Sequence, residues 1–215
     1  MIKFSVIVPY HNEEKKIPDL IRSVAEISFD RREVEFIFVS NNSTDGSDSI
    51  IKAAGYRVEV ANRLRSSYYA RNIGLSSASG EYVVFVDADC ILDKDILNGY
   101  ANSLKAHEGS GPIIYAGAIH PAIQEGSLVE NYSAARRVLN QKSAATGWAY
   151  KPFAQTANAM FARRDLIGIG GFNEYMTSGG DAELCWRLTA KYGHQVILCE
   201  GSVVYHQHRD TVDDF

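Results

Sequence analysis

Short apolar segments alternate with segments of helical periodicity through the first ninety residues of the chain. Each apolar segment has the length of a buried strand, and the segments between them carry apolar residues at helical spacing. A helix between consecutive strands permits a right-handed crossover, so we expect a parallel sheet flanked by helices. Asn12 is expected to cap the first helix. The predicted strands are residues 4–8, 35–39, 57–60 and 82–86, and the predicted helices are 13–24, 50–54 and 68–78.

The second half of the chain has a less regular pattern. Its 146–162 segment is mixed and is expected to form strands and a loop, and we find no internal repeat or linker. A length of 215 residues fits a single domain, residues 1–215. The predicted strands here are 112–118, 196–199 and 203–205, and the predicted helices are 127–142, 165–168 and 181–192.

Charge and hydropathy exclude several classes of protein. The formal net charge of −4 argues against a general nucleic-acid binder, which usually carries a basic face. No apolar run reaches the roughly 18–20 residues that a membrane helix needs, and no signal peptide is recognised at the N-terminus. The three cysteines form no CxxC pair, which indicates reduced thiols. We therefore expect a cytoplasmic protein without a transmembrane segment.

Polar residues follow three of the predicted strands, at 10–12, 40–42 and 87–89. Ligands of parallel sheets bind at the carboxyl ends of the strands, so these residues are expected to line one crevice. Asp87 and Asp89 stand one residue apart, and such close like charges are costly unless a cation or ligand shares them. Oxygen ligands suit Mg²⁺ or Mn²⁺. The other interpretation is a turn that caps a following helix near Asp93 and Asp95.

Three further groups each have two interpretations. Asp181 follows two glycines and is either the N-cap of a helix or a general base. His206 and His208 face the same side of a predicted strand. They are either solvent-facing or core residues, or one of them completes a metal site with Asp89. Arg71 makes either a surface salt bridge or a contact with a nucleotide or phosphate.

Six motifs follow one another along the chain, at residues 6–14, 42–47, 70–74, 85–89, 170–174 and 180–188. Taken in this order, they resemble the motifs of the family 2 glycosyltransferases, which have the GT-A fold. The resemblance covers about residues 2–209 and implies a Rossmann-like, mostly parallel central sheet flanked by helices. It also implies a nucleotide-sugar-binding half, residues 1–90, and an acceptor-side half, residues 91–215.

The resemblance implies a metal-dependent, inverting transfer of one sugar from a nucleoside-diphosphate sugar, with a UDP-sugar favoured. The acceptor is expected to be a hydroxyl of a glycan, a lipid-linked glycan or a small molecule. Asp89 and His206 are expected to bind Mn²⁺ or Mg²⁺, and Asp181 to deprotonate the acceptor. The residues expected to bind the nucleotide sugar are Pro9, Tyr10, His11, Glu13, Ser40, Asn41, Arg71, Asp87, Ala88 and Asp89.

The chain departs from the family pattern at several points. Ser40 stands where the family usually has an aspartate, which puts the choice of nucleotide in doubt. Gly180 stands where the family often has a glutamate, which puts the fit of the acceptor in doubt. Family members usually continue past His206, so a truncated acceptor side is expected. The QxxRW motif of processive synthases is absent, and we expect a non-processive enzyme that is able to dock on the inner face of a membrane.

Two other functions are compatible with parts of this pattern. One is a binding protein of the same fold that has lost turnover, which Ser40 and Gly180 suggest. The other is a sugar-phosphate nucleotidylyltransferase, although the glycine-rich loop expected after its first strand is absent. On the acceptor side, Trp148, Tyr150 and Phe153 either stack on a sugar ring or pack in the core.

Overall fold

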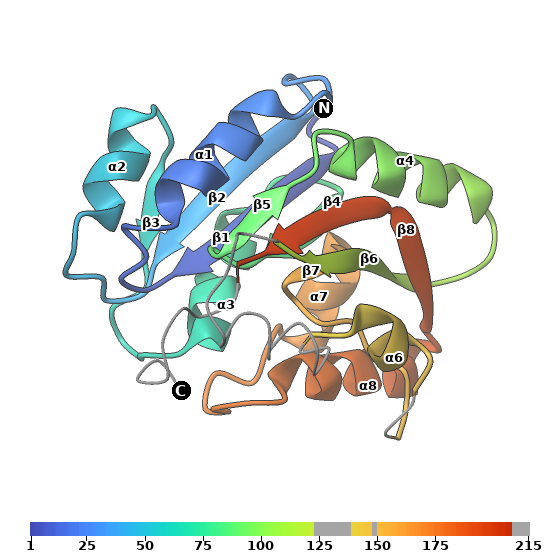
Figure 1. The fold of residues 1–215 in the computed structure, drawn as a ribbon. Helices are drawn as coiled ribbons and strands as arrows, with labels where there is room; N and C mark the ends of the chain where they lie inside the picture. Colours follow the sequence, from blue (N-terminus) through green and yellow to red (C-terminus); the bar gives the residue numbers. More distant parts are fainter. Residues whose placement is uncertain (123–138, 148–149, 208–215) are drawn as a thin grey trace.

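A computed structural model of the chain describes residues 1–122, 139–147 and 150–207. These residues form three layers, with one eight-stranded sheet between two layers of helices (Figure 1). The strands are β1 (Phe4–Tyr10), β2 (Val34–Ser40), β3 (Val58–Val60), β4 (Tyr82–Val86), β5 (Cys90–Leu92), β6 (Ile113–Pro121), β7 (Asn158–Ala162) and β8 (Gln195–His206). The helices are α1 (Ile17–Glu26), α2 (Ser47–Ala53), α3 (Ser67–Ser77), α4 (Ile96–Ala106), α6 (Gln141–Ala145), α7 (Arg163–Ile169) and α8 (Gly180–Tyr192).

The strands lie in the order β3-β2-β1-β4-β7-β6-β8-β5. The first four are parallel to one another, which confirms the α/β fold expected from the alternating pattern. Parallel pairing continues between β6 and β8, whereas β7 is antiparallel to both β4 and β6. The sheet is therefore mostly parallel, and β7 joins the two halves of the chain.

Alternation along the strands divides the core into two clusters. Val6 and Val8 of β1 face one side of the sheet and pack with apolar residues of α1, α2 and α4. Ile7, between them, faces the other side and packs with residues of α3, α7 and α8. Because both faces of the central strands are covered, these strands are largely apolar, as expected for parallel sheets.

Several local expectations are corrected. Asn12 does not cap α1, which begins at Ile17; its φ is 54° and its side chain accepts a hydrogen bond from the Thr44 amide, 2.8 Å away. The strands predicted at 196–199 and 203–205 form one strand, β8, with a register shift opposite Gly117 and Ala118.

Some expectations concern residues that the structure does not describe. Most of the helix predicted at 127–142 lies outside the described residues, as do Trp148 and His208. In the described part of the chain, no helix combines the length and the apolar character that crossing a bilayer requires.

Candidate functional site

The carboxyl ends of β1, β2 and β4 border a cleft of about 390 Å³. Of the residues expected to bind a nucleotide sugar, all except Ser40 line this cleft. Another hollow, of about 520 Å³, lies beside Glu81, Tyr82 and Arg163 and contains none of the residues singled out in the sequence. The first cleft, at the strand ends, is lined by Pro9, Tyr10, His11, Glu13, Asn41, Arg65, Ser66, Ser67, Arg71, Asp87, Ala88 and Asp89.

The imidazole of His11 is held between two neighbours at one side of the cleft. Its Nδ1 lies 2.7 Å from the carbonyl oxygen of Asn41, and its Nε2 lies 2.8 Å from Nη2 of Arg65. Arg65 is always a donor, so Nε2 is the acceptor and Nδ1 carries the proton. The side-chain amide of Asn41 donates in turn, through Nδ2, to the carbonyl oxygens of Ala61 and Leu64. These contacts fix the loop after β2 against the loop after β1.

Ser40 is buried and turned toward α2. Its hydroxyl donates to Oδ1 of Asp48 at 2.7 Å, and the hydroxyl of Tyr10 donates to the same oxygen at 2.8 Å. Burial raises the pKa of Tyr10, and the hydrogen bond to Asp48 raises it further. Asp48 was not predicted as part of the site. It supplies a carboxylate beside Ser40, where the family usually has an aspartate in the strand itself.

Arg71 is buried and forms an ion pair with Asp87, whose side chain is 31% exposed. Nη2 of Arg71 lies 2.5 Å from Oδ1 of Asp87, and the guanidinium faces the rings of Tyr68 and Phe172 at 5.7 and 5.9 Å. Arg71 is 5% exposed, so the surface salt bridge considered from the sequence is wrong. Burial raises the pKa of Asp87, Arg71 opposes that rise, and the charge of Asp89 adds to it.

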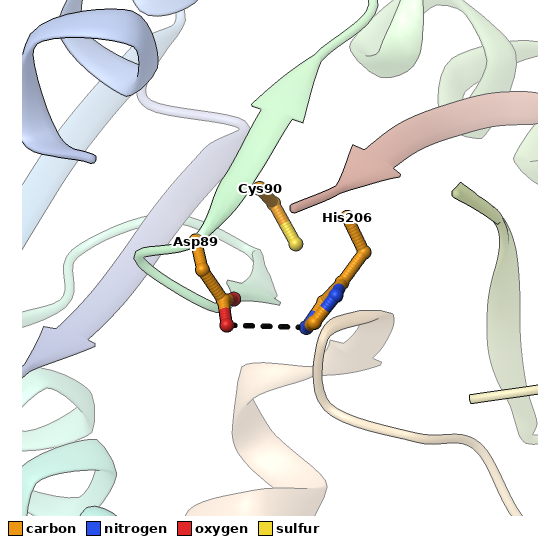
Figure 2. Close-up of side chains that lie close together, drawn as sticks. All are labelled: Asp89, Cys90 and His206. Atoms are coloured by element: carbon orange, nitrogen blue, oxygen red, sulfur yellow. Dashed lines mark ion pairs between the residues drawn. The ribbon is translucent and has the colours of Figure 1, made fainter. Parts of the chain in front are cut away.

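Asp89 and His206 meet across paired strands. Cys90 of β5 pairs with His206 of β8, and Oδ2 of Asp89 lies 3.2 Å from Nε2 of His206 (Figure 2). Lys16 approaches the same oxygen at 3.9 Å. Burial would raise the pKa of Asp89, yet the hydrogen bond and charge of His206 lower it. For His206 the directions are reversed. Burial alone would lower the pKa of His206, but the hydrogen bond and charge of Asp89 outweigh burial and raise it.

Asp87 and Asp89 do not cap a helix. The chain continues from them into strand β5, and α4 begins only at Ile96. The turn itself is present at residues 88 and 89, but it leads into β5, and the N-cap position of α4 is held by Asp95, whose side chain makes no capping hydrogen bond. The sequence before β5 carries no feature that predicts this short strand, whose pairing partner β8 is more than a hundred residues away.

The donor atoms around Asp89 fit a hard divalent cation. Oδ1 of Asp89 is buried and has no hydrogen-bond partner among the described residues. Asp89, Cys90 and His206 each bring one possible ligand atom within 4.8 Å of the others (Figure 2). Burial raises the pKa of Cys90 well above its ordinary value, so its thiol stays protonated. The carboxylate and the imidazole remain, and Mn²⁺ accepts both kinds of ligand.

Asp181 is the second residue of α8, and it does not cap the helix. The N-cap position is held by Gly179, which has no side chain of its own to cap the helix. Oδ2 of Asp181 accepts hydrogen bonds from the amide and hydroxyl of Thr156 at 3.1 and 3.4 Å. Oδ1 accepts from the hydroxyl of Tyr68 at 3.3 Å. The charge of Asp181 contributes to the raised pKa of Asp87, so the two carboxylates belong to the same region of the molecule.

Sequence reasoning missed several residues of this region. Among them, Ser66 carries a recognisable signal, because a serine before a helical segment predicts an N-cap, and its side chain accepts from the Tyr69 amide. Of the aromatic residues considered for an acceptor, Phe153 packs against the core and Tyr150 packs exposed against Trp186, with ring centroids 5.2 Å apart. The missed residues are Lys16, Asp48, Arg65, Ser66, Ser67, Tyr68 and Thr156.

Comparison with known proteins gives a family model and several relatives. The model described as "Glycosyl transferase family 2" matches residues 5–170. Glycosyltransferase AglE of Haloferax volcanii is 26% identical over 207 residues, 91% of this chain and 66% of that protein. Poly(ribitol-phosphate) beta-N-acetylglucosaminyltransferase TarS of Staphylococcus aureus is 35% identical over 112 residues, 50% of this chain and 20% of that protein.

Solved structures share the fold. A mannosyltransferase of Pyrobaculum calidifontis, PcManGT, in complex with GDP-Man and Mn²⁺, superposes with a TM-score of 0.74 at 22% identity. The alignment covers 98% of this chain and 58% of that one. S. aureus TarS 1-349 in complex with UDP-GlcNAc gives a TM-score of 0.73 at 22% identity, covering 98% of this chain and 60% of that one. The chain thus spans less than two thirds of the length of these proteins.

Proposed function

Because this chain belongs to glycosyl transferase family 2, we propose that it transfers one sugar from a nucleoside-diphosphate sugar to an acceptor hydroxyl with inversion at the anomeric carbon. The observation that carries this proposal is the unpartnered, buried oxygen of Asp89, which lies beside His206 at the edge of the cleft. The carboxylate of Asp181, which Thr156 and Tyr68 hold by hydrogen bonds, supplies the second requirement of the reaction, a base.

The nucleoside diphosphate occupies the cleft in this proposal. His11, Arg65 and Asn41 are already fixed by hydrogen bonds and therefore present a preorganised wall to the base and ribose. Arg71 adds a positive charge that Asp87 holds in place. A UDP-sugar is the first donor class to test, and Ser40, which is turned toward Asp48, takes no direct part in binding the base.

Asp89 and His206 would hold a divalent cation, Mn²⁺ or Mg²⁺. When bound, such a cation stabilises the negative charge of a diphosphate leaving group. Asp181 takes the proton of the acceptor hydroxyl, a contribution typically worth 10²–10⁴-fold in rate. One base acting opposite one leaving group gives a single displacement, and a single displacement inverts the anomeric carbon.

The other functions considered from the sequence are less well supported. AglE and TarS are both named as glycosyltransferases, which favours neither a binding protein without turnover nor a nucleotidylyltransferase. The proposal specifies only that the acceptor carries a hydroxyl, whether it is a glycan, a lipid-linked glycan or a small molecule. If the acceptor is lipid-linked, we propose that the enzyme contacts the inner face of a membrane.

Thermal-shift titrations test the donor site. UDP and GDP are each added with Mn²⁺ or with EDTA, and ligand at 100 times its Kd stabilises the fold by about 2.7 kcal/mol. We expect a metal-dependent shift with one of the nucleotides. A protein that no nucleotide stabilises in the presence of Mn²⁺ contradicts the proposal.

Asp181→Asn tests the base. With UDP-GlcNAc, UDP-glucose or GDP-mannose as donor and water as the acceptor, we expect the variant to keep nucleotide binding and lose release of the nucleoside diphosphate. Glu183→Gln is the matched control, because Glu183 lies on the same helix turn and pairs with Arg187. It is expected to keep full turnover. Near-full turnover in Asp181→Asn would show that another residue is the base.

A further inference from the structure

Tyr68 lies at the start of α3, between the donor cleft and α8. Its side chain is buried, and its ring stacks on Phe172 with a centroid distance of 5.7 Å. The guanidinium of Arg71 faces the same ring at 5.7 Å. The ring is therefore held on more than one side, which fixes the position of its hydroxyl.

That hydroxyl makes two hydrogen bonds to consecutive residues of α8. It accepts from the amide of Gly180 at 2.9 Å and donates to Oδ1 of Asp181 at 3.3 Å. A tyrosine hydroxyl has one proton to donate and lone pairs to accept, so both bonds are satisfied at once. Since Thr156 donates to the other oxygen of Asp181, the carboxylate is held from both sides.

The glycine at position 180 is explained by the same ring. A Cβ built on Gly180 would lie 2.6 Å from Cζ of Tyr68, closer than real Cβ contacts come. A glutamate, which the family often has here, would thus collide with the ring. The N-cap, Gly179, has no side chain to accept the first amide of α8, and the hydroxyl of Tyr68 accepts that amide instead.

We propose that Tyr68 is a positioning residue that holds the carboxylate of Asp181 in the orientation in which it accepts the acceptor's proton. This inference rests on the proposed function, in which Asp181 is the base. Tyr68 also faces the guanidinium of Arg71, which pairs with Asp87, so one side chain lies between the donor-side ion pair and the base.

Tyr68→Phe tests the inference because it keeps the ring and removes only the hydroxyl. Misplacement of a catalytic group by about 1 Å costs up to about a hundredfold in rate, and Thr156 still holds one oxygen, so we expect kcat for donor hydrolysis to fall about tenfold or more. The donor KM and the affinity for the nucleoside diphosphate with Mn²⁺ are expected to stay unchanged. A residue that only caps α8 would lower Tm and leave kcat intact.

Tyr69→Phe is the matched control. Tyr69 is the next residue of α3, is also buried, and faces the guanidinium of Arg63 instead of Asp181. Removal of the Tyr69 hydroxyl in this variant is expected to leave kcat for donor hydrolysis unchanged. An equal fall of kcat in both variants would overturn the inference, because it would reflect general loosening of α3.

A double variant separates this inference from the proposed function. When the base is absent there is nothing to position, so Tyr68→Phe is expected to slow the Asp181→Asn variant no further. Near-full turnover in Asp181→Asn alone would overturn the assignment of the base and with it this inference. Lost turnover in Asp181→Asn together with wild-type kcat in Tyr68→Phe would overturn this inference only.

A crystal structure of Tyr68→Phe decides the question even where donor hydrolysis is too slow to measure. We expect the carboxylate of Asp181 to turn or to occupy two orientations, because Oδ1 has lost its donor. A single orientation identical to that of the unchanged protein, with both contacts to Thr156 preserved, would overturn the inference.

Discussion

The two carboxylate oxygens of Asp89 lie in different surroundings. Oδ2 is shared by His206 and Lys16, whereas Oδ1 is buried without a partner among the described residues. A buried carboxylate oxygen without a partner is costly, and a cation bound there removes that cost. The proposal of a cation at Asp89 therefore rests on Oδ1, and its prediction concerns metal affinity.

Asp89→Asn is expected to weaken Mn²⁺ binding by more than about tenfold, since even residues that only support a metal ligand cost 10–100-fold. The measurement is calorimetric titration of Mn²⁺ in the presence of UDP or GDP, whichever stabilises the unchanged protein. Asp95→Asn is the control, because Asp95 lies outside the cleft and its carboxylate accepts from Ser28 and Asn98. Equal Mn²⁺ affinity in both variants would argue against Asp89 as a ligand.

Some residues around the cleft were predicted from the sequence, and others were not. The motif at 85–89 predicted Asp87 and Asp89 as site residues, and the place of His206 at the end of a predicted strand made it a candidate ligand. The structure then places His206 beside Asp89. Tyr68 and Thr156 were missed because nothing in their own segments refers to Asp181, which lies 113 and 25 residues further along the chain, respectively. Ser40 was predicted to face the base because strand ends point to the cleft; Asp48, eight residues on, draws its hydroxyl away.

At the scale of elements, the strands and helices of the first half were predictable, and so were β6, β8, α7 and α8 of the second half. The alternating pattern predicted parallel strands but not their order, because α3 connects β3 to β4, and β2 and β1 lie between these two strands. In the second half, β7 lies between β4 and β6, and β5 pairs with β8, more than a hundred residues further along the chain. Long-range antiparallel pairing of this kind leaves no mark in the spacing of apolar residues, which is why the short strand β5 was not predicted.

Glu35 connects elements of the predictable half. Its Oε1 accepts from the hydroxyl of Ser5 on β1 and from the amide and hydroxyl of Ser79, which lies just before β4. Burial opposes ionisation of Glu35, but these hydrogen bonds outweigh it and lower its pKa below the ordinary value of 4.5. The ionised side chain thus links three neighbouring strands at the amino ends of the sheet.

Glu35→Gln is expected to lower the free energy of unfolding by about 1 kcal/mol at pH 7, a value reduced for solvent screening because the side chain is partly exposed. A lowered folded-state pKa gives stability that is present above the unfolded pKa and is lost as the pH falls through the folded one. The difference between the two proteins is therefore expected to shrink below about pH 4.5. Urea unfolding across this range measures it.

Glu33→Gln is the control for that measurement. Glu33 is exposed, so its substitution by Gln is expected to change the free energy of unfolding by less than about 0.5 kcal/mol at every pH. A gap between Glu35→Gln and the unchanged protein that stays constant down to pH 3 would contradict the ionised link between strands.

At the scale of the whole molecule, the sheet runs without a break from one half of the chain to the other. Strand β4 belongs to residues 1–90 and pairs with β7 from Tyr82 to Val86, and β5 pairs with the end of β8 beside Asp89. The candidate metal ligands Asp89 and His206 accordingly come from the two different halves of the chain. The proposed division into a nucleotide-sugar half and an acceptor half would then be one of roles and not of folding units, and we expect residues 1–215 to unfold as one unit.

The positions of the two tryptophans, Trp148 and Trp186, make this expectation measurable, because both belong to the second half and nearly all of the cleft belongs to the first. Thermal unfolding followed by tryptophan fluorescence and by far-ultraviolet circular dichroism is expected to give coincident transitions. The stabilising nucleotide with Mn²⁺, at 100 times its Kd, adds about 2.7 kcal/mol, which for a domain of this size raises Tm by about 5–10 °C. If the halves fold together, the fluorescence transition moves by the same amount as the dichroism transition, and EDTA cancels both shifts. A fluorescence transition that stays in place while the dichroism signal moves would mean that the halves unfold separately, and that binding in the cleft does not depend on the strand that carries His206.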